Sequence, residues 1–214
     1  MRAPGRPKDP EKRVAILDAA GRLFLQLGFD RTTMDAIAAE AEVSKLTLYS
    51  HFADKEGLFR ALIAYKCGEH FEGRDFEQLA GLPPQEALTR LGNGFVGLMF
   101  HADVLAMYRV LVAGATQDAG LNRAFYEIGP EPTIAGLAGL LAHYHNHSLL
   151  NVPKPTLAAD HFLCMLQGCR HFRRLLNIEA EPSARQLKDH VKDCVAMFLR
   201  AYATRASSSR RSSR

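Results

Sequence analysis

The stretch TMDAIAAEAEVSKLTLYSHF, residues 33–52, has the pattern of two short helices joined by a tight turn. In its first half, apolar residues recur at the spacing that lines one face of a helix: Met34, Ile37, Ala38 and Ala41. Thr33 precedes the first half and Ser44 precedes the second, so each helix can begin with a hydroxyl group that accepts a hydrogen bond from a free amide. We therefore expect a pair of capped helices here.

The second helix of this pair has two chemically different sides. Stepping by about 100° per residue from Ser44 places Leu48 and Phe52 together on one side. The opposite side and its rims carry Leu46, Thr47, Ser50, Tyr49 and His51. The apolar side suits packing against the first helix, and the other side suits a helix that reads base edges in the major groove of DNA.

The longer run TTMDAIAAEAEVSKLTLYSHFADKEGLF resembles the helix-turn-helix signature of the TetR family of transcriptional repressors. That signature reads T-x-x-x-I-A-x-x-A-G-V-S-x-G-T-x-Y-x-H/Y-F-x-x-K-x-x-L. The positions in register with it are Thr33, Ile37, Ala38, Ala41, Val43, Ser44, Thr47, Tyr49, Phe52, Lys55 and Leu58. The resemblance implies an N-terminal three-helix head that binds a double-stranded DNA operator.

Two positions depart from the family signature. Glu42 stands where the turn usually has glycine, so we expect this residue to adopt a positive φ. Leu46 stands where the reading helix usually has glycine. It places a branched apolar side chain at the DNA surface, where a thymine methyl group is a suitable partner. Leu46 is therefore expected to influence sequence preference.

The side chains around the reading helix divide by chemistry into two groups of expected DNA contacts. The candidates for base edges are Lys45, Leu46, Thr47 and Ser50. The candidates for the sugar-phosphate backbone are Thr33, Ser44, Tyr49 and His51. Lys55 is added to the second group because it lies beside the amides that open the next helix, where charge and helix end both favour phosphate. The alternative for Lys55 is a surface lysine without a partner.

The ends of the chain are basic. Residues 1–9 are expected to form a flexible arm, and Arg6 within Gly5-Arg6-Pro7 could enter a minor groove, as basic arms commonly do. A solvated tail without a DNA contact is the alternative. The low-complexity sequence RASSSRRSSR, residues 205–214, is expected to be disordered. The remaining chain divides into a DNA-binding domain over 10–54 and a helical effector-binding and dimerisation domain over 55–204.

The composition sets outer limits on the function. The chain has 214 residues, of which 47% are hydrophobic, and a formal net charge of +4. No run of about 18 apolar residues and no apolar signal segment occur, so we expect a cytoplasmic protein without a membrane span. The four cysteines lack the paired spacing of a zinc module and are expected to be reduced and mostly buried. No phosphate loop, nucleophile elbow or paired-carboxylate motif is present, which predicts neither an enzyme nor a cofactor.

The fold class expected for the whole chain is all-α. A helix is expected from Pro10 to Leu27, and another from Asp54 toward the high seventies. Further helices are expected to start at Pro83-Pro84, Asp103, Asn122, Thr133, Thr156 and Ser183. Asp103 and Thr156 are the expected caps of their helices, and Ser183 with Gln186 forms a capping box.

The C-terminal part resembles the AefR-like branch of the same family in the segments MYRVLVA and LNRAFYEIGP. The resemblance implies a homodimer through the last two helices and a repressor that a small lipophilic effector releases from DNA. The residues expected to form the effector pocket are Phe95, Met99, Met107, Tyr108, Phe125, Tyr126, Phe162 and Met165. The alternative for each of these residues is an ordinary place in the hydrophobic core, without a ligand contact.

Two other functions remain open at this point. His143, His145 and His147 raise the possibility of a metal-responsive repressor, although only His143 and His147 share a helix face and no acid or cysteine stands close by. A DNA-binding protein of low specificity, acting through the basic ends, is the other alternative. Metal content would identify the first, and an affinity that depends on salt without an operator preference would identify the second.

Overall fold

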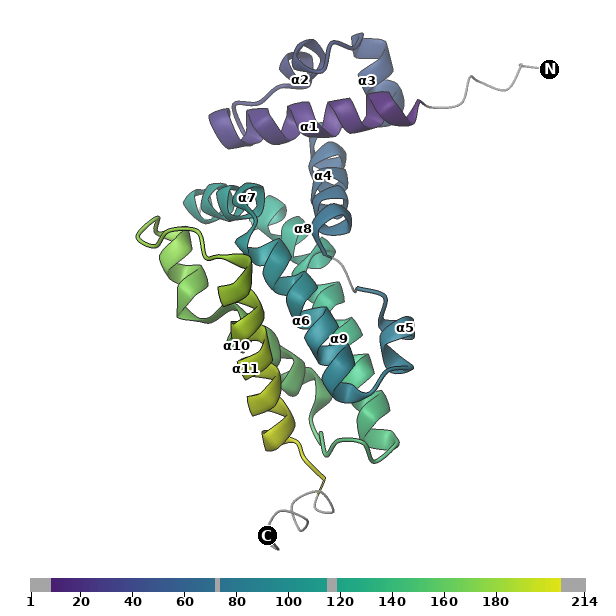
Figure 1. The fold of residues 1–214 in the computed structure, drawn as a ribbon. Helices are drawn as coiled ribbons and strands as arrows, with labels where there is room; N and C mark the ends of the chain where they lie inside the picture. Colours follow the sequence, from purple (N-terminus) through teal and green to yellow (C-terminus); the bar gives the residue numbers. More distant parts are fainter. Residues whose placement is uncertain (1–8, 72–73, 115–118, 205–214) are drawn as a thin grey trace, which may run out of the picture. The chain divides into compact units, whose positions relative to one another are not determined.

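The computed structural model describes residues 9–71, 74–114 and 119–204, and every element in these ranges is a helix (Figure 1). This confirms the all-α expectation. Contacts divide the chain into two compact units. The first comprises residues 1–66 and 106–128, and the second comprises residues 67–105 and 129–214. The expected basic arm with Arg6 and the expected C-terminal tail lie outside the described residues, except for Asp9.

The first unit begins with α1 (Pro10–Leu27), followed by α2 (Met34–Glu40), α3 (Lys45–His51) and α4 (Lys55–His70), whose residues up to Lys66 belong to this unit. Asp9 caps α1 by accepting a hydrogen bond of 3.1 Å from the Glu11 amide, and Gly28 ends it with a φ of 79°. The core of the unit includes the buried rings of Phe24 and Phe59, which meet edge to face at 5.7 Å.

The first unit also contains most of α7 (Ala102–Ala113) and all of α8 (Ala119–Ile128). On α8, Glu127 pairs with Arg60 of α4 at 3.5 Å. The sequence boundary expected after residue 54 assigns α7 and α8 to the body; in the structure, residues 106–128 belong to the same compact unit as α1, α2 and α3.

The second unit contains α5 (Phe76–Ala80), α6 (Pro84–Phe100), α9 (Pro130–Asn146), α10 (Pro155–Leu175) and α11 (Ala184–Ala201). Glycines allow close packing at two places. A Cβ at Gly136 of α9 would overlap the ring of Phe76 of α5, and a Cβ at Gly92 of α6 would lie 2.8 Å from a methyl group of Val191 of α11.

Tyr144 links α9 to the turn between α5 and α6. Its hydroxyl group lies 2.9 Å from the carbonyl oxygen of Leu79 and 3.1 Å from that of Leu82, and its ring is fully buried. Burial disfavours the phenolate and raises the pKa of Tyr144 to about 12. The buried hydroxyl therefore remains a hydrogen-bond donor that stabilises this corner of the unit.

Several helix boundaries differ from those expected. α4 ends at His70, and Asp75 then opens α5 by accepting a hydrogen bond of 3.1 Å from the Gln78 amide, which divides the single helix expected toward the high seventies. Asp103 lies within the first turn of α7, and Thr156 lies within that of α10, so neither is an N-cap. Pro130 and Pro155 occupy the first positions of α9 and α10, where their missing amide hydrogen costs no hydrogen bond.

The capping box at the start of α11 is confirmed. The Gln186 amide donates to the Ser183 hydroxyl at 3.3 Å, and the Ser183 amide donates to the Gln186 side chain at 2.8 Å.

α10 has an interruption at Gly168, where φ is 56° and ψ is −178°. Close to it, His190 of α11 donates to the Leu166 carbonyl oxygen at 2.9 Å.

All four cysteines are free thiols, but the expectation that most are buried is wrong. Cys194 is buried and Cys67 is half-buried, and burial raises the pKa of both. Cys164 and Cys169 are exposed because they lie outside the buried side of α10, which includes Phe162 and Leu166.

Within the described ranges, no single helix is long and apolar enough to cross a membrane; α6 and α7 pass that test only as a pair bent by 63°.

Candidate nucleic-acid interface

The helix pair of the first unit is held by its two expected caps. Thr33 accepts a hydrogen bond of 3.1 Å from the Ala36 amide, and Ser44 accepts one of 3.1 Å from the Thr47 amide. Between α2 and α3, Glu42 has a φ of 53°, as expected for the position that the family signature gives to glycine. The turn therefore keeps its geometry without glycine.

The apolar side of α3 is packed into the unit. Leu48 is fully buried and the following Phe52 is buried, as are Ile37 and Ala38 of α2. The guanidinium group of Arg13 from α1 lies 4.8 Å from the centre of the Phe52 ring. These contacts leave α3 one outward side and prevent it from rotating about its axis.

The outward side of α3 contains most of the residues expected to contact DNA. Leu46 is 83% exposed and Tyr49 is 50% exposed. Lys45 and Ser50 are exposed, and Thr47 and His51 are half-buried. The structure thus brings the predicted base-reading residues together on one helix face.

The polar groups on this face already have intramolecular partners. The Lys45 ammonium lies 2.6 Å from the Asp35 carboxylate of α2, and this hydrogen bond and the carboxylate charge raise the pKa of Lys45. Ser50 donates to the Thr47 carbonyl oxygen at 2.7 Å, and the hydroxyl groups of Ser44 and Thr47 lie 2.9 Å apart. A serine or threonine hydroxyl retains acceptor capacity after donating, so Ser50 can still accept from a base.

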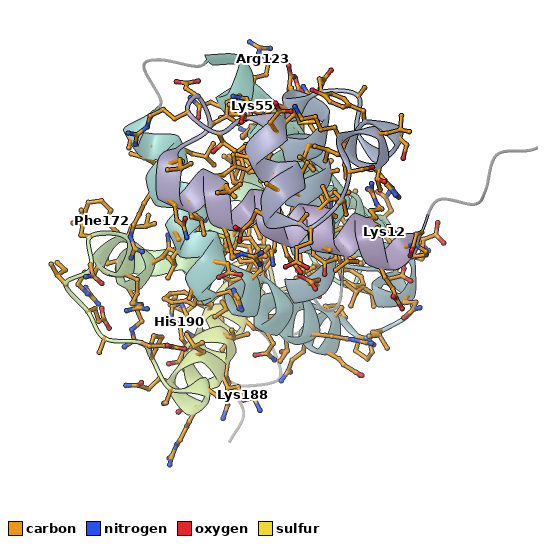
Figure 2. All side chains as sticks on the ribbon, turned by 90° about the horizontal axis from the view of Figure 1, so that it is seen from above. Lys12, Lys55, Arg123, Phe172, Lys188 and His190 are labelled. Atoms are coloured by element: carbon orange, nitrogen blue, oxygen red, sulfur yellow. The ribbon has the colours of Figure 1, made fainter. Side chains whose placement is uncertain are left out.

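Lys55 occupies a different environment from the one expected. The ammonium of this side chain, which is labelled in Figure 2, donates to the carbonyl oxygens of Phe29, Asp30 and Thr32 at 2.7, 3.2 and 3.0 Å. It also lies 4.4 Å from the centre of the Phe29 ring. Three acceptors match the three hydrogen atoms of an ammonium group, so the charge is directed into the loop between α1 and α2.

Sequence reasoning missed the partners of both lysines. Asp35 is ten residues from Lys45, and the carbonyl groups that surround Lys55 are 23 to 26 residues away. Such distances in sequence produce no periodic signal. Of the other expected contacts, Thr33 and Ser44 use their side-chain oxygens as caps, and the His51 ring lies 6.2 Å from that of Phe52.

The residues expected to form one effector pocket divide between the two units. Met107, Tyr108, Phe125 and Tyr126 belong to the first unit, and Phe95, Met99, Phe162 and Met165 to the second. Within the first, the rings of Tyr108 and Phe125 meet at 5.1 Å, while Tyr126 is half exposed. Within the second, Phe162 packs against Phe198 at 4.9 Å.

A pocket lies inside the first unit, and none of the eight expected residues lines it. It is bounded by residues 26–31 of α1 and the following loop, by the end of α7 and by Leu121 and Asn122 of α8. Its volume is about 410 Å³. These segments are about 80 residues apart in sequence, which is why no local pattern indicated the pocket.

The histidines at the end of α9 contact backbone atoms. The Nδ1 atom of His147 lies 2.8 Å from the His143 carbonyl oxygen, and Nδ1 of His145 accepts a hydrogen bond from the Val152 amide at 3.2 Å. Over the residues that the structure describes, no group of three or more histidine, cysteine, aspartate or glutamate side chains is arranged to hold a metal ion.

Comparison with known families gives two matches that together cover most of the chain. Residues 16–62 match the family described as bacterial regulatory proteins, tetR family. Residues 86–204 match the C-terminal domain of the AefR-like transcriptional repressors. The first match contains the helix pair, and the second confirms the resemblance of the C-terminal part.

Individual proteins show the same likeness. The uncharacterized HTH-type transcriptional regulator YerO of Bacillus subtilis is 28% identical over 190 residues, which are 86% of this chain and 65% of that protein. The chain spans less than two thirds of the length of the first curated relatives it matches.

Solved structures match over nearly the whole chain. A TetR-family regulator from Mesorhizobium loti is 28% identical with a TM-score of 0.75, covering 93% of this chain and all of that one. The flavonoid-responsive regulator FrrA is 31% identical with a TM-score of 0.71, covering 92% of this chain and all of that one.

Proposed function

Since the chain belongs to the TetR family of bacterial transcriptional regulators, we propose that it is a dimeric repressor that binds a near-palindromic operator and is released by a small lipophilic effector. The observation that carries this proposal is the outward side of α3. A helix whose back is buried through Leu48 while Leu46 and Tyr49 project outward is built to enter a groove.

In this proposal, some side chains of α3 contact bases and others contact the phosphate backbone. Leu46 contacts a thymine methyl group, while Thr47 and Ser50 offer hydroxyl groups to base edges. Tyr49 and His51, with Thr33 and Ser44 at the helix starts, fix the position of the helix on the phosphates. Lys45 exchanges Asp35 for DNA, because a phosphate or base acceptor can replace the carboxylate of an exposed pair at little cost.

Lys55 has another role in this proposal. Its ammonium is satisfied by three carbonyl groups of the first unit, and moving it to a phosphate would break all three of these hydrogen bonds. We therefore assign Lys55 to holding the loop between α1 and α2 against the start of α4. The expected phosphate contact is replaced by a structural one.

The last two helices support dimer formation. Large apolar side chains of α10 and α11 are exposed to solvent: Phe172 of α10, labelled in Figure 2, is 61% exposed, and Met197 of α11 is 46% exposed. These are the helices that TetR-family proteins use to dimerise, and their exposed apolar side chains are available to a second copy of the chain. A twofold dimer presents two reading helices, which doubles the base contacts and requires half-sites separated by about one turn of DNA or a multiple of it.

The proposed effector is an apolar small molecule. FrrA is described as flavonoid-responsive, and a chain 31% identical to it over nearly its whole length is a reasonable candidate for a related class of ligand. Phe95, Met99, Phe162 and Met165 supply the apolar side chains of the second unit. An effector acts only through its different affinities for the DNA-binding and the released state. A regulator of this kind works in the cytoplasm, where its operator lies.

Selection of bound duplexes from a random DNA pool tests the proposal. We expect enrichment of a palindrome with half-sites about one turn or more apart. The variant Leu46→Glu should lose the enrichment, because it places a carboxylate against DNA, and the matched variant Leu149→Glu on an exposed loop of the second unit should retain it. Equal recovery of all sequences would contradict the proposal and support a DNA-binding protein of low specificity.

A further inference from the structure

The pocket of the first unit is large enough for a small molecule. Its volume of about 410 Å³ falls within the range of about 300–1,000 Å³ that is typical of ligand sites. One wall is the segment from Gln26 to Arg31, and the other is formed by the end of α7 and the first turn of α8. All of these residues belong to the same compact unit as α2 and α3.

The walls define the chemistry of an occupant. Leu111 and Leu121 are buried and form an apolar floor, to which Leu27, Phe29 and Val110 add further apolar surface. The lining also contains the side-chain amides of Gln26 and Asn122 and the opposite charges of Asp30 and Arg31. The two charges balance, and Arg31 also donates to the Leu27 carbonyl oxygen at 2.9 Å. These walls suit an uncharged, mainly apolar molecule with a hydrogen-bonding group at one edge.

The pocket is connected to the DNA-binding helices through Lys55. Phe29 and Asp30 line the pocket, and their carbonyl oxygens accept hydrogen bonds from the Lys55 ammonium at the start of α4. The Phe29 ring also contacts Phe24 and Phe59, at 5.3 and 5.5 Å. A molecule that contacts Phe29 and Asp30 therefore acts on the residues that hold α4 immediately after α3.

The opposite wall is also connected to α4. Glu127 of α8 pairs with Arg60, which pairs with Glu56 one turn earlier in α4. A molecule that bridges the loop and α8 contacts two elements that are each joined to α4. Its binding energy therefore depends on the arrangement of α4 with respect to α1 and α8, which is the condition for a ligand to favour one of two states.

We propose that this pocket binds a small uncharged, mainly apolar molecule carrying a hydroxyl or carbonyl group, and that occupancy changes the affinity of α3 for DNA. This site is distinct from the apolar residues of the second unit. Its regulatory effect rests on the proposed function as an operator-binding protein, whereas ligand binding at the pocket does not.

The chain contains no tryptophan, so a single introduced tryptophan reports on one place in the protein. The reporter is Gln26→Trp at the pocket, and the matched control is Gln85→Trp at an exposed position of α6. The probe is 4-bromo-4′-hydroxybiphenyl, which has two apolar rings, one hydroxyl group and a bromine atom that quenches tryptophan fluorescence on contact.

We expect saturable quenching of Gln26→Trp and only weak, linear quenching of Gln85→Trp. Adding Ala113→Phe to the reporter fills the pocket with a ring and should raise the quenching midpoint by about tenfold or more. The thermal unfolding midpoint of each variant shows whether it remains folded, and Ala113→Ser is the substitute if Ala113→Phe does not fold. Equal linear quenching at both tryptophans, or a midpoint that neither Ala113 variant changes, overturns the site.

The effect on DNA is measured separately, by fluorescence anisotropy of the selected operator. We expect a saturating concentration of the probe to change the operator affinity by about threefold or more, and Lys55→Met to reduce that change. Saturable quenching without any change in operator affinity overturns the regulatory assignment. Failure of the DNA selection contradicts the proposed function and leaves the quenching result standing, so the two failures are distinguishable.

Discussion

The Lys55 ammonium lies 2.7 Å from the carbonyl oxygen of Phe29, and this contact joins the start of α4 to the loop that precedes α2. Two further carbonyl groups of the same loop accept from the same ammonium. The Lys55 ammonium thus donates to three carbonyl groups of the loop, of which that of Phe29 also accepts from the Thr32 amide at 3.3 Å. The arrangement makes the position of α4 sensitive to the loop, and the loop sensitive to α4.

Replacing Lys55 by methionine should destabilise the protein. The variant keeps most of the side-chain volume but removes the donor, and taking this hydrogen bond from the part-buried Thr32 carbonyl group costs about 1–3 kcal/mol. Urea unfolding measures the change, with Lys188→Met on the exposed side of α11 as the control. Unchanged stability together with a salt slope of DNA binding lowered by about one would instead indicate the phosphate contact.

Leu46→Gly should alter sequence preference at one operator position. The side chain is 83% exposed in the free protein, so its removal creates no cavity, and its loss removes a contact specific for a thymine methyl group. Repeating the DNA selection with the variant measures the change. Leu46→Ala separates the loss of the contact from the cost of glycine in a helix, which is about 1 kcal/mol. An unchanged preference at every position in both variants would place Leu46 away from the bases.

Unlike Leu46→Gly, Tyr49→Phe should weaken binding to all duplexes and leave the sequence preference unchanged. Tyr49 lies on the rim of α3 and is half exposed, so its hydroxyl group is placed for a phosphate oxygen. Loss of one hydrogen bond to a charged acceptor costs about 1.5–3 kcal/mol. Titrations with the selected operator and a scrambled duplex at one salt concentration give the two affinities. A loss confined to the operator would assign Tyr49 to base recognition.

Gly168→Ala should destabilise the second unit although the glycine lies within α10. Its φ of 56° with a ψ of −178° is accessible almost only to glycine, and forcing another residue into such a region costs about 1–3 kcal/mol. Gly139 of α9 is the matched control, because a Cβ there would meet no neighbouring atom. Gly139→Ala should be stabilising by about 0.5–1 kcal/mol. Equal effects of the two substitutions on thermal unfolding would show that α10 has no interruption in solution.

These sites also show which features could be predicted from sequence. The caps Thr33, Ser44 and Ser183 depend on residues three positions away, and the two sides of α3 follow from helix geometry alone. The family signature also located the positive φ of Glu42. All of these features are local in the chain.

Features that depend on tertiary contacts were missed. The carbonyl partners of Lys55 are more than 20 residues away, and the pocket brings together the α1–α2 loop and the start of α8. Gly168 lies in a stretch whose apolar period continues on both sides, so no pattern distinguishes its backbone from that of an ordinary helical glycine. Contacts of this kind become visible only when the helices are placed in three dimensions.

The buried His171 should make the protein less stable in mild acid. His171 packs edge to face against Phe100 at 5.8 Å, and burial lowers its pKa below the ordinary value of about 6.5. Because the unfolded chain binds a proton at a higher pH than the folded protein, the stability from this group is complete above about pH 6.5. It decreases as the pH falls through the lower folded pKa, by at most about 1.4 kcal/mol per pH unit.

His171→Phe should remove this part of the pH dependence, since phenylalanine keeps the aromatic contact and cannot be protonated. Urea unfolding of both proteins at neutral pH and about pH 5 gives the difference between them, in which the other histidines cancel. His161→Phe, at an exposed position of the same helix, is the control and should retain the wild-type dependence. If His171→Phe loses as much stability in acid as the wild type, His171 is not the group whose protonation destabilises the second unit.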